Sequence, residues 1–209
     1  MSENIQKHWN KFYQNFLLNK ESSFAKFLVS KIKNCKSLYL LDIACGNARD
    51  TNFFNSMGFK SEGLDFSSTV IKKNRKNFSN INFYLKDVCK PNFKIKKKYD
   101  ILYSRFFLHA INEESEDIFL KNCIKILKKK SFFFLEFRTS KDPLIKKGKV
   151  ISKYERIFGH YRRFINLKEF RKRVNLYGYK IYYLKTSYNY AKFKRQKPHI
   201  ARVILIKND

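Results

Sequence analysis

The sequence predicts an α/β fold in which a seven-stranded, mostly parallel sheet carries helices on both faces. Apolar segments typical of buried strands alternate with amphipathic segments over residues 37–209, which is the pattern of a parallel sheet. Acidic residues also end three successive predicted strands, at Asp42, Asp65 and Asp87. Because ligands bind outside the carboxyl ends of parallel strands, these acids mark the candidate site.

Each strand is predicted from a short apolar run between turn residues. Five strands belong to the alternating part of the chain, and two long C-terminal ones are expected to close the sheet as an antiparallel pair. The predicted strands cover residues 38–43, 61–65, 81–86, 99–104, 131–137, 179–187 and 199–207.

The helices are predicted from apolar residues at helical spacing and from their capping residues. They are expected within residues 5–33 and over residues 48–57, 67–77, 113–129 and 166–177. Ser67 is the predicted N-cap of one helix, and Asn166 with Glu169 forms a capping-box-like start for the last. Acidic residues open the helix at 113–129 and lysines 128–130 close it, as the helix dipole favours.

Length and composition indicate one domain without a membrane span. The chain has 209 residues, of which 44% are hydrophobic, enough for a single core. No run approaches about 18 apolar residues, and the N-terminus lacks the apolar region of a secretory signal. The four cysteines have no metal-ligand spacing, which fits the reduced thiols of a cytoplasmic protein.

The net charge of +29 allows two interpretations. One is a polyanionic partner such as nucleic acid, which a strongly basic surface would attract. The other is the coding bias of an AT-rich genome, because lysine far outnumbers arginine while Asn, Ile, Phe and Tyr are also abundant. We favour the second, so a nucleic-acid partner is left open but is not favoured.

Residues 42–50 resemble motif I of the class I S-adenosylmethionine-dependent methyltransferases, usually written Asp/Glu-x-Gly-x-Gly-x-Gly. Of its three glycines only Gly46 is present, and Ala44 and Ala48 replace the others. The order of predicted elements over residues 37–209 is also that of the Rossmann-like methyltransferase domain. A dinucleotide-binding domain is the alternative, but it would need Gly-x-Gly-x-x-Gly at this turn.

The resemblance also implies two accessory regions. The aromatic residues at 9–13 resemble the helix that closes over the cofactor in many such enzymes, so residues 1–36 are expected to form an N-terminal helical cap. Residues 139–165 are expected to form a lid over the acceptor.

The cofactor implied by the resemblance is S-adenosylmethionine, with S-adenosylhomocysteine as product. Asp42 and Gly46 would hold its methionine end, Asp65 its ribose hydroxyls, and Asp87 with Val88 its adenine. The further cofactor-binding residues that the resemblance implies are Trp9, Tyr13, Ala44, Arg49, Asp50, Phe66 and Ser104.

The acceptor is expected to be a small anion. The loop after the strand at 99–104 faces the acceptor in this family, and here it lacks the Asn/Asp-Pro-Pro-Tyr/Phe motif of many methyltransferases that act on amino groups of nucleic acids and proteins. Arginines gather near the predicted mouth instead, and guanidinium groups bind phosphate or carboxylate through two hydrogen bonds. They are Arg105, Arg138, Arg162 and Arg163.

Methyl transfer requires that the acceptor is aligned and loses its proton. His109 and His160 are the candidate bases, because imidazole titrates near neutrality. Either histidine could instead donate to a backbone carbonyl in a structural role. Tyr154 and Tyr161 are expected to orient the acceptor, and no metal site is predicted.

The segments 103–111, 136–138 and 159–165 resemble a subgroup of bacterial small-molecule methyltransferases. Some of that subgroup are encoded with genes that modify surface polysaccharides, including with O-methyl phosphoramidate groups. We therefore expect O-methylation of a phosphate- or carboxylate-bearing metabolite, such as a polysaccharide or phosphoramidate precursor. Two alternatives stay open: an RNA-modifying methyltransferase that uses the basic surface, and a non-catalytic protein that binds S-adenosylmethionine.

Overall fold

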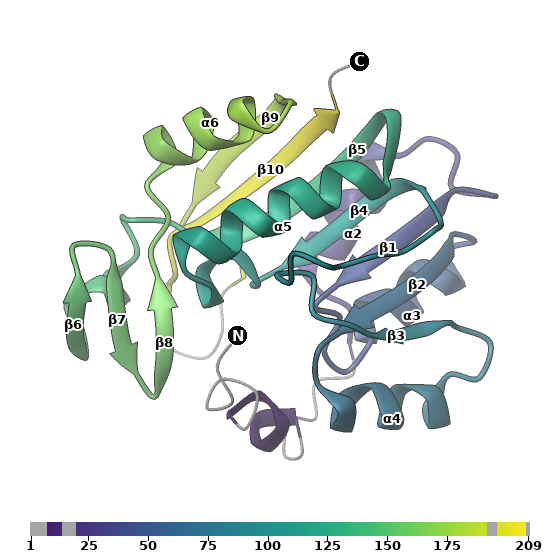
Figure 1. Ribbon diagram of the computed structural model, residues 1–209, viewed down its shortest axis with the longest axis horizontal. Coiled ribbons are helices and arrows are strands. Elements are labelled where there is room, and N and C mark those ends of the chain that lie inside the picture. Colours follow the sequence, from purple (N-terminus) through teal and green to yellow (C-terminus); the bar gives the residue numbers. More distant parts are fainter. Residues whose placement is uncertain (1–7, 14–19, 192–195, 208–209) are drawn as a thin grey trace.

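The computed structural model describes residues 8–13, 20–191 and 196–207. Its main sheet consists of β1 (Tyr39–Ile43), β2 (Lys60–Asp65), β3 (Phe83–Leu85), β4 (Tyr99–Arg105), β5 (Leu127–Arg138), β9 (Tyr179–Ser187) and β10 (Ile200–Lys207). The strand order is β3-β2-β1-β4-β5-β10-β9 (Figure 1). All pairs are parallel except the two that β10 makes, with β5 and β9. The predicted fold class is confirmed.

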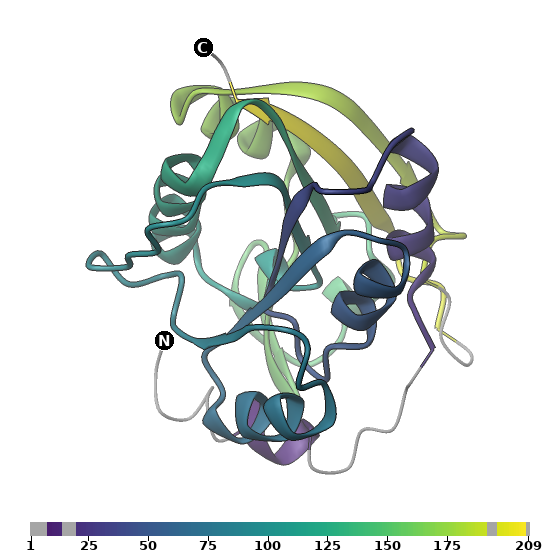
Figure 2. The same cartoon turned by 90° about the vertical axis from the view of Figure 1, so that its right-hand side faces the viewer.

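Five helices cover the two faces of this sheet (Figures 1 and 2). They are α2 (Ser23–Lys31), α3 (Arg49–Ser56), α4 (Ser68–Asn77), α5 (Glu113–Ile126) and α6 (Leu167–Leu176). Side chains of successive strand residues point to opposite faces. Leu41 and Ile43 accordingly join the core with α5 and α6, whereas Leu40 packs with α2 and α3.

The predicted helix starts are confirmed, and one predicted helix end is wrong. The Ser67 hydroxyl accepts from the N–H of Val70, and the Asn166 side chain accepts from two N–H groups of the first turn of α6. The helix predicted to reach residue 129 ends at Ile126, so lysines 128–130 belong to β5. Leu127 already pairs with Tyr99 of β4, so the strand replaces the last helical turn; the lysines fall at the register shift before Phe132, with Lys130 at φ +56°.

The insert at 139–165 contains a second sheet that the sequence reading did not predict. Its strands are β6 (Lys149–Ser152), β7 (Glu155–Phe158) and β8 (His160–Arg163), which pair antiparallel in this order. The small sheet projects from one end of the molecule (left in Figure 1). Short helical turns, η1 (Leu108–Ala110) and η2 (Pro143–Lys146), flank the chain segments that lead to it.

The N-terminal part of the chain has two different positions. Phe24, Ala25 and Leu28 of α2 are fully buried in the core, so α2 belongs to the body rather than to a cap. Residues 8–13 form a short helical segment beside α4 (Figures 1 and 2), where the Ser67 hydroxyl donates to the Asn10 side chain. Residues 5–7 and 14–19 of the predicted helical region lie outside the described residues.

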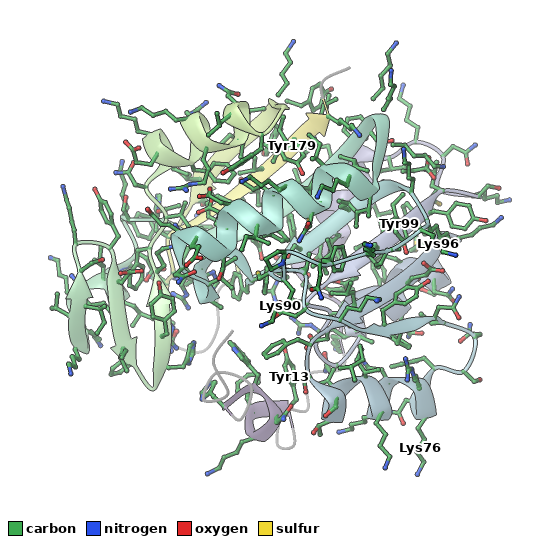
Figure 3. All side chains as sticks on the ribbon, viewed as in Figure 1. Tyr13, Lys76, Lys90, Lys96, Tyr99 and Tyr179 are labelled. Atoms are coloured by element: carbon green, nitrogen blue, oxygen red, sulfur yellow. The ribbon has the colours of Figure 1, made fainter. Side chains whose placement is uncertain are left out.

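The surface of the described chain carries many lysines, and Figure 3 shows Lys76 of α4 projecting away from the body. No described helix is both long and apolar enough to cross a membrane.

Candidate active site

The turn after β1 is left-handed at every second residue. Ala44, Gly46 and Ala48 have φ values of +60°, +53° and +59°. These are the three positions that glycine fills in motif I, and alanine takes two of them here. Left-handed backbone costs an L-residue about 1–2 kcal/mol. Hydrogen bonds hold the turn in this shape, among them Ala48 N–H to the Cys45 carbonyl at 3.0 Å.

Asp65, at the end of β2, ties this turn to the next strand. Its Oδ2 accepts from the Gly46 N–H at 3.1 Å and its Oδ1 from the Ser67 N–H at 2.9 Å. The carboxylate is 4% exposed, and this burial raises the pKa of Asp65 to about 6. A polar ligand at this strand end would therefore meet a buried acceptor.

Two further carboxylates lie on the other side of the turn. The Thr51 hydroxyl of α3 donates to Asp42 Oδ2 at 2.6 Å. Asp50 accepts from the Tyr103 hydroxyl at 2.7 Å and from the Ser22 N–H at 2.7 Å. Burial, together with the nearby charge of Asp50, raises the pKa of Asp42 to about 8.

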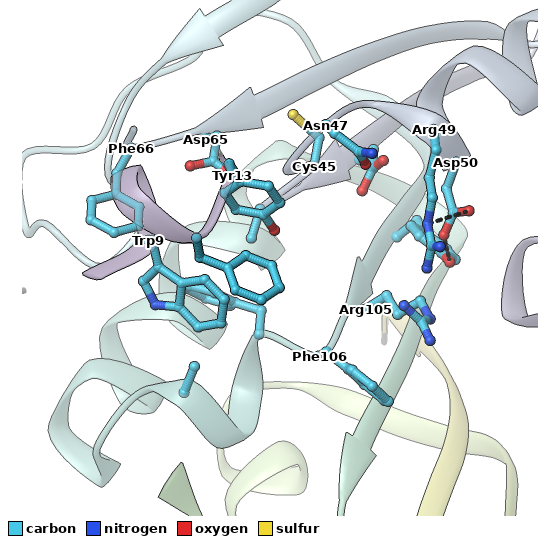
Figure 4. Close-up of a pocket in the computed structure, with 16 residues that line it drawn as sticks. Trp9, Tyr13, Cys45, Asn47, Arg49, Asp50, Asp65, Phe66, Arg105 and Phe106 are labelled. Carbon is cyan, nitrogen blue, oxygen red and sulfur yellow. Dashed lines mark hydrogen bonds and ion pairs between the residues drawn. The ribbon is translucent and has the colours of Figure 1, made fainter. Parts of the chain in front are cut away.

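A crevice follows the carboxyl ends of β1 to β4. Its larger part is lined by Trp9, Phe12, Tyr13, Asp42, Ala44, Cys45, Asn47, Arg49, Asp50, Asp65, Phe66, Tyr103, Arg105, Phe106, Phe107 and Ala110 (Figure 4). A smaller hollow toward β3 is lined by Ala44, Leu64, Asp65, Phe66, Lys86, Asp87, Val88 and Phe107. The two hollows share lining residues, among them Asp65, so they form one continuous crevice.

Tyr13 and Trp9 reach the crevice from the helical segment 8–13. The Tyr13 phenol lies on the turn so closely that a Cβ added to Gly46 would come 2.3 Å from its Oη. Figure 4 shows the ring beside Asp65, with Trp9 nearby. Burial and the Asp65 charge raise the pKa of Tyr13, so the hydroxyl stays protonated.

The end of β4 contributes an arginine that is already paired with a carboxylate, which it shares with a second arginine. Arg105 Nε lies 2.9 Å from one oxygen of the buried Glu136, and Arg202 Nε lies 2.8 Å from the other. Phe106 follows at φ +59°, held by a 2.8 Å hydrogen bond from its N–H to the Glu136 carbonyl. Ser104 donates its hydroxyl to a carbonyl of β1 and is not among the crevice-lining residues.

Arg138 and Arg162 lie at the mouth, where the small sheet meets the crevice. The Arg138 guanidinium forms a 2.8 Å ion pair with Asp142 and lies 5.9 Å from the centre of the Phe106 ring. Arg162 donates to the Phe158 carbonyl and makes no ion pair with any described residue. Burial and the neighbouring Arg138 lower the pKa of Arg162 to about 10. Arg162 therefore brings to the mouth a positive charge that forms no ion pair with a described carboxylate, and Asp142, the partner of Arg138, is near enough to stabilise it.

The two candidate bases differ in position. His109 is buried, and its Nδ1 accepts from the Arg138 N–H at 3.3 Å, which is a structural role. The His160 ring lies 5.3 Å from Trp9 and 4.7 Å from His8. Burial and the Arg162 charge lower the pKa of His160 to about 3, so it is neutral at neutral pH.

Known proteins with similar sequences are methyltransferases. Residues 40–130 match the model of a methyltransferase domain family. Over 104 residues, 48% of this chain, the sequence is 29% identical to "Putative methyltransferase 235L" of Invertebrate iridescent virus 6. The matched segment spans 38% of that protein's length.

Solved structures share the whole fold. An S-adenosylmethionine-dependent methyltransferase from Clostridium acetobutylicum ATCC 824 has a TM-score of 0.72 at 13% identity, covering 89% of this chain and 91% of that one. PH0226 from Pyrococcus horikoshii OT3 has a TM-score of 0.72 at 17% identity, and the match covers 95% of this chain and 99% of that one. The glycopeptide N-methyltransferase MtfA complexed with S-adenosylmethionine has a TM-score of 0.69 at 13% identity, and the match covers 91% of this chain and 96% of that one.

Residues 40–130 thus match a methyltransferase domain, and the fold of the described chain is that of S-adenosylmethionine-dependent methyltransferases. The side chains that line the crevice have chemical groups that would suit S-adenosylmethionine. Asp65 places a buried carboxylate at the end of β2, where ribose hydroxyls need an acceptor. Val88 and Phe107 give the smaller hollow apolar walls that would suit a flat base, and the carboxyl groups of Asp42 and Asp50 line the larger part.

Of the predicted acceptor residues, only Arg105 is among those that line the crevice; Arg138 and Arg162 lie beside it at the mouth. Arg163 is buried and paired with Glu116 of α5, so it is occupied inside the fold. Tyr161 donates to Glu155, and the Tyr154 hydroxyl accepts a 2.8 Å hydrogen bond from the N-cap side chain of α6. These three residues support the insert rather than line the crevice.

Sequence reasoning missed several residues of the site. Phe12, Asn47 and Phe106 line the crevice, and His8 contacts His160. Asn47 lies inside motif I and could have been included on that ground. The place of His8 follows from tertiary contact alone, so no pattern in the sequence marks it.

Proposed function

We propose that this protein transfers a methyl group from S-adenosylmethionine to an oxygen atom of a small anionic acceptor. The charge of Arg162, which forms no ion pair with a described residue and lies beside Arg138 at the mouth, is the observation that supports an anionic acceptor. The mouth adjoins the crevice through Trp9, which contacts His160, and through Phe106, which lies near Arg138.

On the cofactor side, the proposal assigns Asp65 to the ribose hydroxyls and Asp87 with Val88 to the adenine. Asp42, Gly46 and the rest of the turn would hold the methionine end. When bound, S-adenosylmethionine supplies an electrophilic methyl group on a sulfonium. Trp9 and Tyr13 would exclude water from the crevice, since both already line it from the segment 8–13.

On the acceptor side, the arginines would align the anion and leave one of its oxygens facing the crevice. Alignment supplies much of the rate in such a transfer. An ionised oxygen already carries its reactive electron pair, whereas an ammonium must first lose a proton. His160 remains the candidate base for an acceptor that needs one, although its lowered pKa makes it weak.

The test is methyl transfer from methyl-labelled S-adenosylmethionine to phosphorylated metabolites, carboxylated metabolites, neutral amines and total RNA. We expect label in an anionic small molecule, with loss of transfer in Arg162→Ala. Lys149→Ala is the matched control, because it removes an exposed charge from the same small sheet. Transfer only to RNA, falling steeply as salt is raised, would replace this proposal with the RNA-modifying alternative.

A further inference from the structure

His8 brings an unsatisfied polar atom to the mouth. Its ring lies 4.7 Å from that of His160, and the next residue, Trp9, lies 5.3 Å from the same ring. The Nε2 atom of His8 is buried and has no hydrogen-bond partner among the described residues. Buried polar atoms are nearly always paired in folded proteins, so an unpaired one calls for a ligand.

The charges around this atom indicate the ligand's chemistry. Arg162 has no carboxylate partner among the described residues, and Arg138 shares its charge with Asp142 through Nη1 alone. His160 and Arg162 are two residues apart on β8, so their side chains lie on the same face of that strand, and the His8 ring contacts the His160 ring. Two guanidinium groups and two neutral imidazoles therefore gather on this side of the crevice, where Asp142 pairs with one guanidinium and leaves a net positive charge.

The number of donors separates two classes of anion. A carboxylate offers two oxygens and one charge, which a single guanidinium satisfies. A phosphate group offers three acceptor oxygens and close to two charges at neutral pH. The four donor groups of this cluster exceed what a carboxylate can use, and their number suits a tetrahedral oxyanion.

We infer that His8, Arg138, His160 and Arg162 form a subsite for a phosphate-type oxyanion, the recognition group of the methyl acceptor. The inference rests on the proposed function for the identity of the ligand as acceptor, but the anion subsite stands on its own contacts. It assigns to His8 a binding role that no motif in the chain indicates.

The same helical segment links this subsite to the cofactor crevice. His8 lies at the mouth, and Tyr13, five residues later, lies on the Gly46 turn. An anion that fixes His8 would also hold Tyr13 in place. Binding of the anion and of the cofactor product should therefore strengthen each other by the same factor.

The experiment is calorimetric titration of the full chain with inorganic phosphate or acetate at constant ionic strength, with and without S-adenosylhomocysteine. We expect phosphate to bind more tightly than acetate, and to bind more tightly still when S-adenosylhomocysteine is present. Loss of one charged hydrogen-bond donor should weaken phosphate binding about tenfold in Arg162→Ala and several-fold in His8→Ala. Lys149→Ala, which removes one exposed charge nearby, should change it less than twofold.

Histidine ring NMR spectra of the same samples locate the anion, because phosphate should shift the ring signals that His8→Ala and His160→Ala remove. The inference is overturned if phosphate binds no better than acetate, or if Arg162→Ala behaves as Lys149→Ala does. Phosphate binding without S-adenosylhomocysteine binding would instead refute the proposed function and leave the subsite standing.

Discussion

The hydroxyl of Tyr13 lies directly over the backbone of Gly46, where a Cβ would come within 2.3 Å of Oη. Gly46 also has a φ of +53°, which side-chain-bearing residues adopt at a cost. Glycine is thus required here for conformation and for space. The contact also anchors the segment 8–13 to the turn that begins the cofactor site.

The first prediction separates these two requirements. Gly46→Ala should weaken S-adenosylhomocysteine binding at least about tenfold, because it displaces Tyr13 as well as straining the turn. Gly159→Ala is the control, since Gly159 has φ +75° with nothing within 4 Å of an added Cβ. It should lose about 1 kcal/mol of stability and keep its affinity. Equal affinities in the two variants, measured by calorimetry, would refute the Tyr13 contact.

The second prediction concerns the alanines of the turn. Ala44 has φ +60°, so Ala44→Gly should raise the free energy of unfolding by about 1 kcal/mol. Ala25→Gly, at a buried position within α2, should lower it by about 1 kcal/mol or more. Urea unfolding measures both values. A destabilised Ala44→Gly would show that the methyl group contributes more by packing than it costs in backbone strain.

The third prediction is a pH dependence caused by Asp42. Its folded pKa, about 8, lies above the ordinary value of 3.8, so the unfolded chain releases its proton first as pH rises. Stability should therefore fall between about pH 4 and pH 8, where the folded state binds more protons. Asp42→Asn keeps an acceptor for Thr51 and removes the buried charge.

Unfolding curves at pH 5, 6.5 and 8 test this directly. Asp42→Asn should be more stable than wild type at pH 8 by more than about 1 kcal/mol, with the difference shrinking toward pH 5. Glu169→Gln, which changes an exposed carboxylate of α6, should follow the wild-type curve. Parallel curves for wild type and Asp42→Asn would contradict the assignment.

The fourth prediction distinguishes two adjacent arginines. Arg163→Ala should cost about 3 kcal/mol of stability, because the buried Glu116 loses its shortest ion pair and is left with the longer one, 3.6 Å, to Arg173. Arg162→Ala should cost less than about 1 kcal/mol, since Arg162 makes no ion pair with a described residue, and should lose phosphate binding instead. Thermal unfolding and phosphate titration of both variants check this. The reverse pattern would exchange the roles of the two side chains.

The cofactor side of the site was predictable because it depends on strand ends. Apolar periodicity predicts that β1 and β2 belong to a parallel sheet. Parallel strands bring Asp42 and Asp65 to the same edge of that sheet, independently of the loop conformations. Ser67 and Asn166 were predictable as caps for a similar reason, since capping is a local interaction.

The acceptor side was less predictable because it depends on tertiary contacts. The strands of the small sheet have four residues each and carry charges, so their alternation is too short to recognise. Once β8 is known, Arg162 and Arg163 must point to opposite faces, and only one can reach the mouth. His8 reaches its place only through packing against His160.

The most direct test of the central claim is calorimetric titration of S-adenosylhomocysteine into the wild-type protein and Asp65→Ala, with circular dichroism to verify folding. Glu169→Gln serves as the charge-matched control on an exposed surface. The predicted result is one binding site per chain, with affinity at least about tenfold weaker in Asp65→Ala and unchanged in Glu169→Gln. No binding to the wild type, or equal affinity in folded Asp65→Ala, would contradict a cofactor site at the end of β2.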